Sequence, residues 1–244
     1  MSKVDDSLET ICARFEQHFP LLANLDVPHT HALKFFTARA GVLIPLVQRD
    51  GEWFVLLTKR STNLRTNPGD VALPGGKAND FEGSLAAALR EANEEIGLND
   101  VIVNGRVEVF TSRAGIGVTP YVAVVDESTF TPVLNAAEVE SLFAAPMSLF
   151  LNQLHALDKT EPWNLFFDVE TVPIATTKAS QAPLSAEVFR VYGLTAFILL
   201  RCLAIMAPQQ VRRLVSRERL DELEFFIDQT RVRVREEIDA AAQL

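Results

Sequence analysis

The sequence predicts an α+β fold: a mixed β-sheet between helices, as an α/β/α sandwich, with additional N- and C-terminal helices. Short apolar runs and helical patterns follow one another without the strict alternation of a parallel α/β protein. Neither an internal repeat nor a low-complexity tract interrupts them. The chain has 244 residues, of which 48% are hydrophobic and 23% charged, so it is long enough to enclose a substantial core.

The first third of the chain changes from a helical to a strand pattern. Residues 5–25 carry apolar side chains at helical spacing and predict an amphipathic helix. Two apolar runs flank the Asp50-Gly51 dipeptide, which predicts a hairpin of two strands, Ala40–Gln48 and Trp53–Lys59. The polar stretch Ser61–Gly76 predicts a loop with one short strand at Val71–Leu73.

The rest of the chain mixes the two patterns. Gly115 and Gly117 predict a turn between two strands, and Pro208 predicts a break between two C-terminal helices. The predicted elements are a helix at Leu85–Ile96, strands at Val101–Thr111 and Val118–Asp126, helices at Glu138–Ala144 and Met147–Ala156, a strand at Trp163–Val169, a connector to Pro183, and the two helices within Ser185–Leu244.

One apolar stretch, Val188–Ala207, approaches the length of a membrane span. It contains Arg190 and Arg201, and no aromatic belts flank it. Because a central arginine is costly inside a bilayer, the pattern favours a buried core helix, and no membrane partner is expected.

Charge, cysteine content and the N-terminal residues indicate which classes of partner and which cellular compartment to expect. A net charge of −9 argues against a nucleic-acid partner, but a bound cation would still allow a phosphorylated substrate. Cys12 and Cys202 lie far apart, which favours two thiols in a reducing compartment over one disulfide. The acidic N-terminus lacks the features of a signal or transit peptide. The expected location is cytoplasmic, with an organelle such as the peroxisome left open.

The helix predicted at Leu85–Ile96 separates an apolar stripe from a carboxylate face. At about 100° per residue, Glu91, Glu94 and Glu95 lie opposite the stripe, and Glu91 and Glu95 are one turn apart. Gly97 predicts the C-terminal end of the helix. The stripe consists of Leu85, Leu89, Ala92 and Ile96.

Three carboxylates in the last turns of a helix are unfavourable. Each costs about 0.3–1 kcal/mol against the negative end of the helix dipole. A divalent cation would offset this cost, because carboxylate oxygens are preferred ligands of magnesium. The alternative is a solvated acidic face. Two neighbouring features favour a site: the Pro-Gly-Gly turn at Pro74, which lets backbone approach a ligand, and the opposite charges of Glu82 and Arg90.

The segment Gly76–Leu98 resembles the signature of the Nudix family, in which fixed glycine, glutamate and arginine positions surround a short helix. Ala92 is acceptable at an apolar position of that pattern. So many positions agree over so short a segment that a chance match is not a reasonable explanation. The resemblance implies a mixed-sheet α/β/α sandwich and metal-dependent hydrolysis of a diphosphate linkage. The matching residues are Gly76, Glu82, Arg90, Glu91, Glu94, Glu95, Gly97 and Leu98.

The resemblance also implies roles for these residues. Glu91 and Glu95 are implied as the main metal ligands, with Glu94 assisting. Glu82 and Arg90 are implied to support catalysis by holding the loop onto the helix. The implied cofactor is Mg²⁺, with Mn²⁺ as a substitute, and the implied partner is a small-molecule diphosphate.

Bound magnesium neutralises a diphosphate, which otherwise repels a nucleophile, and helps to activate a water. A carboxylate then accepts the proton of that water. Glu94 and Glu138 are both candidates for this base, and the sequence does not choose between them.

A second resemblance, upstream, is to the coenzyme A diphosphatase branch of the family. It implies cleavage of coenzyme A or acyl-coenzyme A to 3′,5′-ADP and (acyl-)4′-phosphopantetheine. Lys59, Arg60 and Arg65 form a basic group suited to phosphate, and Gly75 and Gly76 allow close backbone approach. The alternative is surface cations that pair with nearby acids. The matching positions are Leu56-Leu57-Thr58, Arg60-Ser61, Arg65, Gly69 and Pro74-Gly75-Gly76, and weaker similarity extends the match over residues 37–205.

Three residues depart from the pattern of this branch, which usually has His, Gln and Phe where Asn67, Asp70 and Leu73 stand. Asp70 adds a negative charge close to a presumed phosphate site. Rival predictions are therefore a Nudix hydrolase for another substrate, such as ADP-ribose or NADH, and a non-catalytic binding module on the same scaffold.

The predicted domain boundaries are a helical extension at 1–36, a hydrolase domain at 37–205 and a second helical extension at 206–244 that packs on the domain. The long C-terminal helix, roughly 209–242, either covers the core or forms a homodimer contact.

Overall fold

A mixed sheet at the centre of the molecule lies between two layers of helices. This computed structural model describes residues 7–18, 36–99, 101–154, 165–176 and 187–220. The six main strands lie in the order β10-β8-β2-β1-β7-β5. Strand β1 (Ala38–Arg49) runs parallel to β7 (Ile116–Val124), and the other pairs are antiparallel. Mixed strand directions between helical layers confirm the predicted α+β class.

The sheet also contains three short strands beside the six main ones. Three strands of two or three residues each pair with β1, β2 and β7. The bounds are β2 Glu52–Arg60, β3 Val71–Ala72, β4 Gly75–Lys77, β5 Ile102–Arg106, β6 Phe110–Thr111, β8 Val139–Pro146 and β10 Val172–Thr176.

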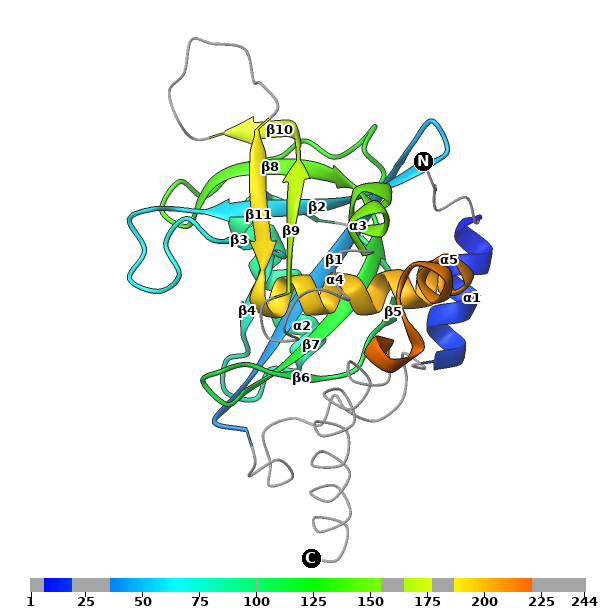
Figure 1. Cartoon of the computed structure of the whole chain (residues 1–244). Helices are drawn as coiled ribbons and strands as arrows, with labels where there is room; N and C mark the ends of the chain where they lie inside the picture. The colour runs from blue at the N-terminus through cyan, green and yellow to red at the C-terminus, as the bar shows by residue number, and fades with distance from the viewer. Residues whose placement is uncertain (1–6, 19–35, 100, 155–164, 177–186, 221–244) are drawn as a thin grey trace, which may run out of the picture.

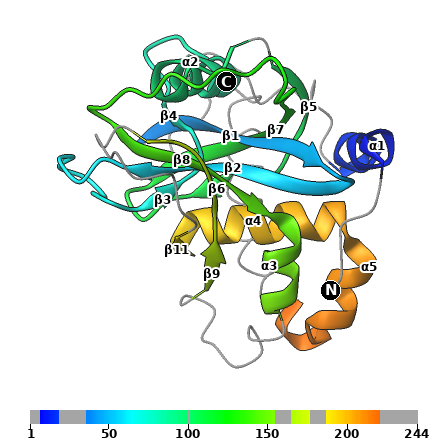
Figure 2. The same ribbon diagram turned by 90° about the horizontal axis from the view of Figure 1, so that it is seen from above.

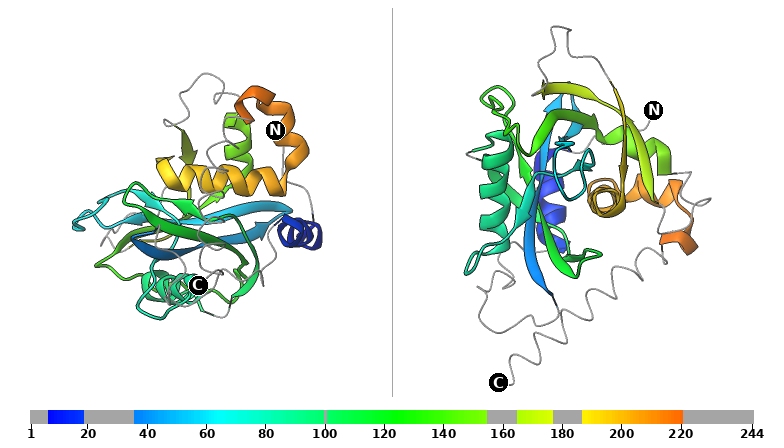
Figure 3. Two further views of the ribbon diagram at one scale, coloured as in Figure 1. Left: turned by 90° about the horizontal axis from the view of Figure 1, so that it is seen from below. Right: turned by 90° about the vertical axis from the view of Figure 1, so that its left-hand side faces the viewer.

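The two faces of the sheet are covered differently. Helix α2 (Ser84–Ile96) covers one face, and α4 (Gly193–Met206) lies against the other with α3 (Met147–Gln153) and α5 (Pro208–Leu214) beside it (Figure 2). Figure 3, right, shows α2 and α4 on opposite sides of the sheet. The three layers are therefore helix, sheet and helix, as the sequence predicted.

A separate two-stranded sheet also lies on the α4 side. Strands β9 (Phe166–Glu170) and β11 (Val188–Tyr192) pair antiparallel and run across the direction of β2 and β8 (Figure 1). Phe167, Val169 and Val191 point into the core, whereas alternate residues are exposed. This pair therefore closes the core on that side.

Helix α1 (Leu8–His18) packs beside β5 through Ile11 and Phe15, which are both fully buried. A methyl group at Gly105 of β5 would lie 2.5 Å from Cβ of Phe15. The helix predicted at 5–25 is confirmed over these residues, and its last part, 19–25, lies outside the described residues. The predicted helix at 209–242 is interrupted at Val215 and Ser216, and its part from 221 onward lies outside the described residues. The three-part domain division stays a prediction.

Three predicted elements are wrong. Glu138–Ala144 was predicted as a helix, but Val139–Pro146 is strand β8. Because β8 lies between β2 and β10 with both faces covered, its apolar run has no alternating pattern that would separate a strand from a helix. Residues of the predicted connector form β10, and the start of the predicted helix at 188 is β11.

The apolar stretch that prompted a membrane test is a core helix from Gly193 onward. Arg201 of α4 pairs with the buried Glu108, with Nε 2.7 Å from Oε1, so the charge in this helix has a partner inside the protein. Within the described residues no single helix meets the length and hydropathy of a membrane span; α4 and α5 do so only as a pair, bent by 116°.

Candidate metal centre and substrate loop

Helix α2 is held very close to the sheet by small residues. A methyl group at Gly41 of β1 would lie 1.7 Å from the carbonyl oxygen of Ser84 and 3.0 Å from Cβ of Ala88. Ala88, Ala92 and Ile96 are buried in this contact. The predicted stripe is thus confirmed at Ala92 and Ile96, whereas its two leucines, Leu85 and Leu89, are only partly buried.

The end of α2 is set by Gly97, as predicted. Its backbone has φ 71°, in the left-handed region, and its N–H donates to the carbonyl oxygen of Asn93 at 2.9 Å. The next N–H, of Leu98, donates to Ala92 at 3.3 Å. This cap ends α2 at Ile96, directly after Glu95.

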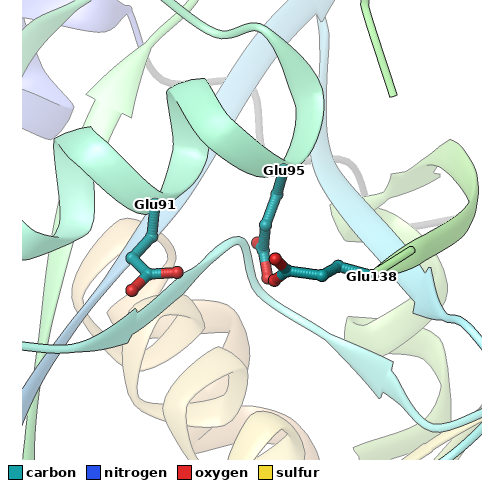
Figure 4. A group of neighbouring side chains, drawn as sticks. All are labelled: Glu91, Glu95 and Glu138. Atoms are coloured by element: carbon teal, nitrogen blue, oxygen red, sulfur yellow. The ribbon is translucent and has the colours of Figure 1, made fainter. Parts of the chain in front are cut away.

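Three carboxylates meet at the end of α2. Glu91, Glu95 and Glu138 each offer an oxygen, and these oxygens lie within 4.8 Å of one another. Figure 4 shows Glu95 and Glu138 facing each other, with Glu91 projecting from the preceding turn of the helix. The one-turn spacing of Glu91 and Glu95 was predicted, and the fold adds Glu138 to them.

A turn at Asn135 places Glu138. The N–H of Asn135 donates to the carbonyl oxygen of Glu95 at 3.0 Å, and its Nδ2 donates to Oε1 of Glu138 at 3.3 Å. The N–H of Glu138 donates to the carbonyl oxygen of Asn135 at 2.9 Å. Sequence reasoning missed Asn135, because only the docking of this turn onto α2 reveals its role.

The Gly75-Gly76 backbone passes directly beneath the carboxylates. The N–H of Gly75, at φ 146°, donates to Oε2 of Glu95 at 3.1 Å. A methyl group at Gly76 would lie 2.4 Å from the carboxyl carbon of Glu91. Glycine at these two positions therefore leaves room for Glu91 and Glu95, the candidate metal ligands. The sequence had predicted another reason for glycine there, which was close approach of the backbone to the substrate.

The charge of the buried Glu95 carboxyl is only partly offset by neighbouring hydrogen-bond donors and cations. Its residue is 3% exposed, and burial raises its pKa to about 7. The Gly75 hydrogen bond and the charge of Arg60 oppose this rise, whereas Glu91 and Glu138 add to it. Crowded carboxylate oxygens are donors that suit Mg²⁺ or Mn²⁺, and a cation would offset their mutual repulsion.

Arg90 fastens the loop to the helix, as predicted. Its Nε and Nη2 donate to the two carboxyl oxygens of Glu82 at 2.9 and 3.0 Å, and Nη2 also donates to the carbonyl oxygen of Lys77 at 3.1 Å. Its Nη1 donates to Oε1 of Glu91 at 2.9 Å. The hydrogen bond from Arg90 is the main reason that the pKa of Glu82 lies below its usual value.

Glu94 lies outside the group of three carboxylates. Its side chain is 53% exposed, and Oε2 accepts a hydrogen bond from Nη1 of Arg90 at 3.1 Å. Its implied roles as assisting ligand and base stay predictions.

The predicted basic group is divided by the sheet. Arg60 faces the α2 side, where its Nη1 lies 3.9 Å from Oε1 of Glu95. Lys59 faces the α4 side, where it pairs with Glu140 at 2.8 Å and lies over the Phe189 ring at 5.1 Å. Neighbouring strand residues point to opposite faces, so Lys59 does not join the group, contrary to the prediction. Arg65 is exposed in the loop between β2 and β3.

The fold and site define a class of protein: an α/β/α sandwich with three carboxylates gathered at the end of a helix, where they form a candidate site for a divalent cation. The chain belongs to the NUDIX family, because the model for the NUDIX domain matches residues 37–188.

Curated relatives support this assignment. The chain is 35% identical over 183 residues to "Nudix hydrolase 15, mitochondrial" of Arabidopsis thaliana. The aligned region covers 70% of this chain and 60% of that protein. It is 38% identical over 151 residues to "Uncharacterized Nudix hydrolase NudL" of Yersinia pestis (strain Pestoides F), covering 59% and 74%. Thus the chain spans only 60% of the first relative and 57% of a second Arabidopsis protein, "Nudix hydrolase 22, chloroplastic".

Among solved structures, a NUDIX hydrolase from Alicyclobacillus acidocaldarius matches with 19% identity and a TM-score of 0.41 over 49% of this chain and 83% of that one.

Magnesium is expected to raise the melting temperature of the metal-free protein. A ligand that binds only the folded state at 100 times its Kd contributes about 2.7 kcal/mol. For a chain of this length, that contribution corresponds to a rise of about 6 °C. Calorimetry of EDTA-treated protein, with and without MgCl₂ at constant ionic strength, measures this rise.

Two variants test whether the rise comes from the candidate metal centre. Glu95→Gln should lose most of the rise, whereas Glu170→Gln, a change of the same kind on the exposed face of β9, should keep it. An equal rise in both variants would contradict the site.

Proposed function

We propose that this protein hydrolyses the diphosphate linkage of coenzyme A or acyl-coenzyme A with Mg²⁺, to give 3′,5′-ADP and (acyl-)4′-phosphopantetheine. The observation that carries the hydrolytic part is the convergence of Glu91, Glu95 and Glu138 within 4.8 Å, with the guanidinium of Arg60 beside Glu95. Membership of the NUDIX family supports the same chemistry.

Glu91 and Glu95 are proposed to hold the cation, with Glu138 or Glu94 completing the protein ligands. When bound, the cation neutralises diphosphate oxygens and lowers the pKa of a coordinated water. Arg90 holds Glu82 through two hydrogen bonds and the carbonyl oxygen of Lys77, next to Gly76, through a third. This arrangement fixes the ligands before the substrate arrives, which reduces the cost of ordering them.

The proton of the attacking water goes to a carboxylate, and Glu138 is our proposed acceptor. Its Oε1 accepts a hydrogen bond from Asn135, which fixes the orientation of the carboxyl group and leaves Oε2 to take the proton. Glu94 is the alternative. Its exposed carboxyl lies outside the group of three and already accepts a hydrogen bond from Arg90 through Oε2.

The proposal of coenzyme A rests on the loop before the helix. Arg60 and Arg65 match the resemblance, and among the described residues Arg60 Nε is a buried donor with no hydrogen-bond partner. Such a donor is suited to an incoming phosphate oxygen, since an unbonded buried N–H is costly. Arg65 is exposed and makes no ion pair with any described residue. The two arginines would bind the diphosphate and the 3′-phosphate.

A panel of diphosphates tests the substrate. With Mg²⁺, release of 3′,5′-ADP from coenzyme A is expected to have a kcat/KM at least about 10-fold above that for ADP-ribose or NADH, which is about 1.4 kcal/mol of differential transition-state binding. Product chromatography at several substrate concentrations measures kcat and KM for each substrate. Dephospho-coenzyme A, which lacks the 3′-phosphate, is the matched control and should be a poorer substrate.

Two other outcomes are distinguishable. A higher kcat/KM for ADP-ribose or NADH would replace coenzyme A with another nucleoside diphosphate derivative while leaving the hydrolase intact. Tight binding without turnover of any substrate would establish a binding module on a NUDIX scaffold. The crowded carboxylates argue against that second case, because a module without a cation has no need of them.

A further inference from the structure

Asp70, the acidic residue that departs from the coenzyme A pattern, is engaged by a tyrosine from the C-terminal half of the chain. The hydroxyl of Tyr192 donates to Oδ1 of Asp70 at 2.6 Å, across 122 positions of sequence. This distance is in the short part of the range for O–H···O hydrogen bonds. The hydrogen bond is also the main cause that raises the pKa of Tyr192, so the hydroxyl keeps its proton at neutral pH.

The loop that Asp70 ends is held at its start by the N–H of Ser61, which donates to the carbonyl oxygen of Glu138 at 2.8 Å, and has few restraints between its ends. We call Ser61–Asp70 the substrate loop. Most of its side chains are exposed, and its internal backbone hydrogen bonds are long, at 3.3 Å for Leu64 to Ser61 and 3.4 Å for Asp70 to Asn67. Within the described part of the chain, Tyr192 to Asp70 is the one side-chain hydrogen bond that joins this loop to another element.

Both ends of the substrate loop adjoin the candidate metal centre. At its start, the N–H of Arg60 donates to the carbonyl oxygen of Asp70 at 2.9 Å, and the guanidinium of Arg60 lies 3.9 Å from Glu95. After Asp70, the chain passes through β3, where Oγ1 of Thr195 donates to the carbonyl oxygen of Val71 at 3.4 Å. The backbone of Asp70 is thus hydrogen-bonded directly to that of Arg60.

Tyr192 is itself on a fixed element. It ends β11 and directly precedes α4, whose residues are mostly buried, and its Cα pairs with that of Phe166 in β9. The tyrosine therefore presents its hydroxyl from a paired strand to a loop that has few hydrogen bonds of its own.

We infer that Tyr192 is a positioning residue for the substrate: through Asp70 it holds the substrate loop so that Arg60 and Arg65 reach the phosphate groups. This inference rests on the proposed hydrolysis of a diphosphate. Asp70 serves as a hydrogen-bond acceptor in this role, and its charge is directed to Tyr192 instead of toward the substrate.

Tyr192→Phe tests this role because it removes only the hydroxyl group. KM for coenzyme A is expected to rise about 5- to 10-fold while kcat stays within about 2-fold, as for the loss of uniform binding. Asp70→Ala should raise KM similarly, and the double variant should add little to either change, because both remove one interaction. Hydrogen–deuterium exchange of residues 61–70 should become faster in Tyr192→Phe.

Asp168→Asn is the matched control. Asp168 is bonded to Arg190 at 2.8 Å on the exposed face of the same two-stranded sheet and does not contact the substrate loop. This variant should keep the wild-type KM and the wild-type exchange of residues 61–70. A purely structural loss would instead lower kcat and the melting temperature together.

Two results would overturn the inference while the proposed function stands. One is an unchanged KM or unchanged exchange of residues 61–70 in Tyr192→Phe. The other is a fall in KM for Asp70→Asn with no effect of Tyr192→Phe, which would show that the Asp70 charge acts on the substrate directly. If the wild-type protein turns over another diphosphate, KM is measured with that substrate. A wild-type protein with no turnover on the whole panel would remove the proposed function, and the positioning role with it.

Discussion

Glu91→Gln is expected to lower kcat/KM at least about 10³-fold, which is about 4 kcal/mol of transition-state stabilisation. Glutamine has nearly the same volume but no charge, so it should fit over Gly76 while weakening the hold on the cation. Arg90 would lose one ionic partner at 2.9 Å but keep both bonds to Glu82. Steady-state kinetics with saturating Mg²⁺ and the preferred substrate measure the loss.

The fold should survive this substitution. In EDTA the melting temperature of Glu91→Gln should stay within about 3 °C of the wild type, because the change also removes repulsion with Glu95 and Glu138. Glu170→Gln, on the exposed face of β9, should retain full activity. Wild-type kcat/KM in Glu91→Gln would exclude Glu91 as a ligand, and unfolding in EDTA would show that its role is structural.

Gly41→Ala is expected to have the largest effect on stability. Its methyl group would lie 1.7 Å from the carbonyl oxygen of Ser84, so α2 must move away from β1. Overpacking of this kind costs about 3 kcal/mol, and the melting temperature should fall by about 9 °C. Because α2 carries Glu91 and Glu95, the affinity for Mg²⁺ should fall as well. Thermal unfolding at several Mg²⁺ concentrations measures both effects.

Gly51→Ala separates this steric effect from the cost of an alanine backbone. Gly51 has φ 75° in the hairpin turn, and a methyl group there would have nothing within 4 Å. It should cost about 1 kcal/mol through backbone strain alone. Its response to Mg²⁺ should be that of the wild type. Equal losses in the two variants would contradict the close packing of α2 on β1.

The local part of the site could be predicted from the sequence because it is set by helical geometry. The one-turn spacing of Glu91 and Glu95, the pairing of Arg90 with Glu82 and the end at Gly97 all depend on residues within a single turn–helix segment. The structure places each of these as predicted. The hairpin of β1 and β2 followed from the Asp50-Gly51 turn for the same reason.

Helix Glu138–Ala144 was the largest error, and its cause is burial. A strand covered on both faces has no alternation, and an apolar run alone does not separate it from a short helix. The edges of β8 pair with β2 and β10, and its two faces are buried in separate core clusters, with α2 and α3 in contact with it. Neither pairing is visible in the run itself.

The sequence by itself determined the family, the α+β class and two carboxylates of the candidate metal centre, since these depend on residues near one another in the chain. Only the tertiary structure decided which distant groups join them. It brought Glu138 to Glu95 through the turn at Asn135 and sent the neighbours Lys59 and Arg60 to opposite faces of the sheet. It also gave Asp70 a partner in Tyr192. Sheet pairing sets these contacts, and it depends on the whole core, not on any one segment.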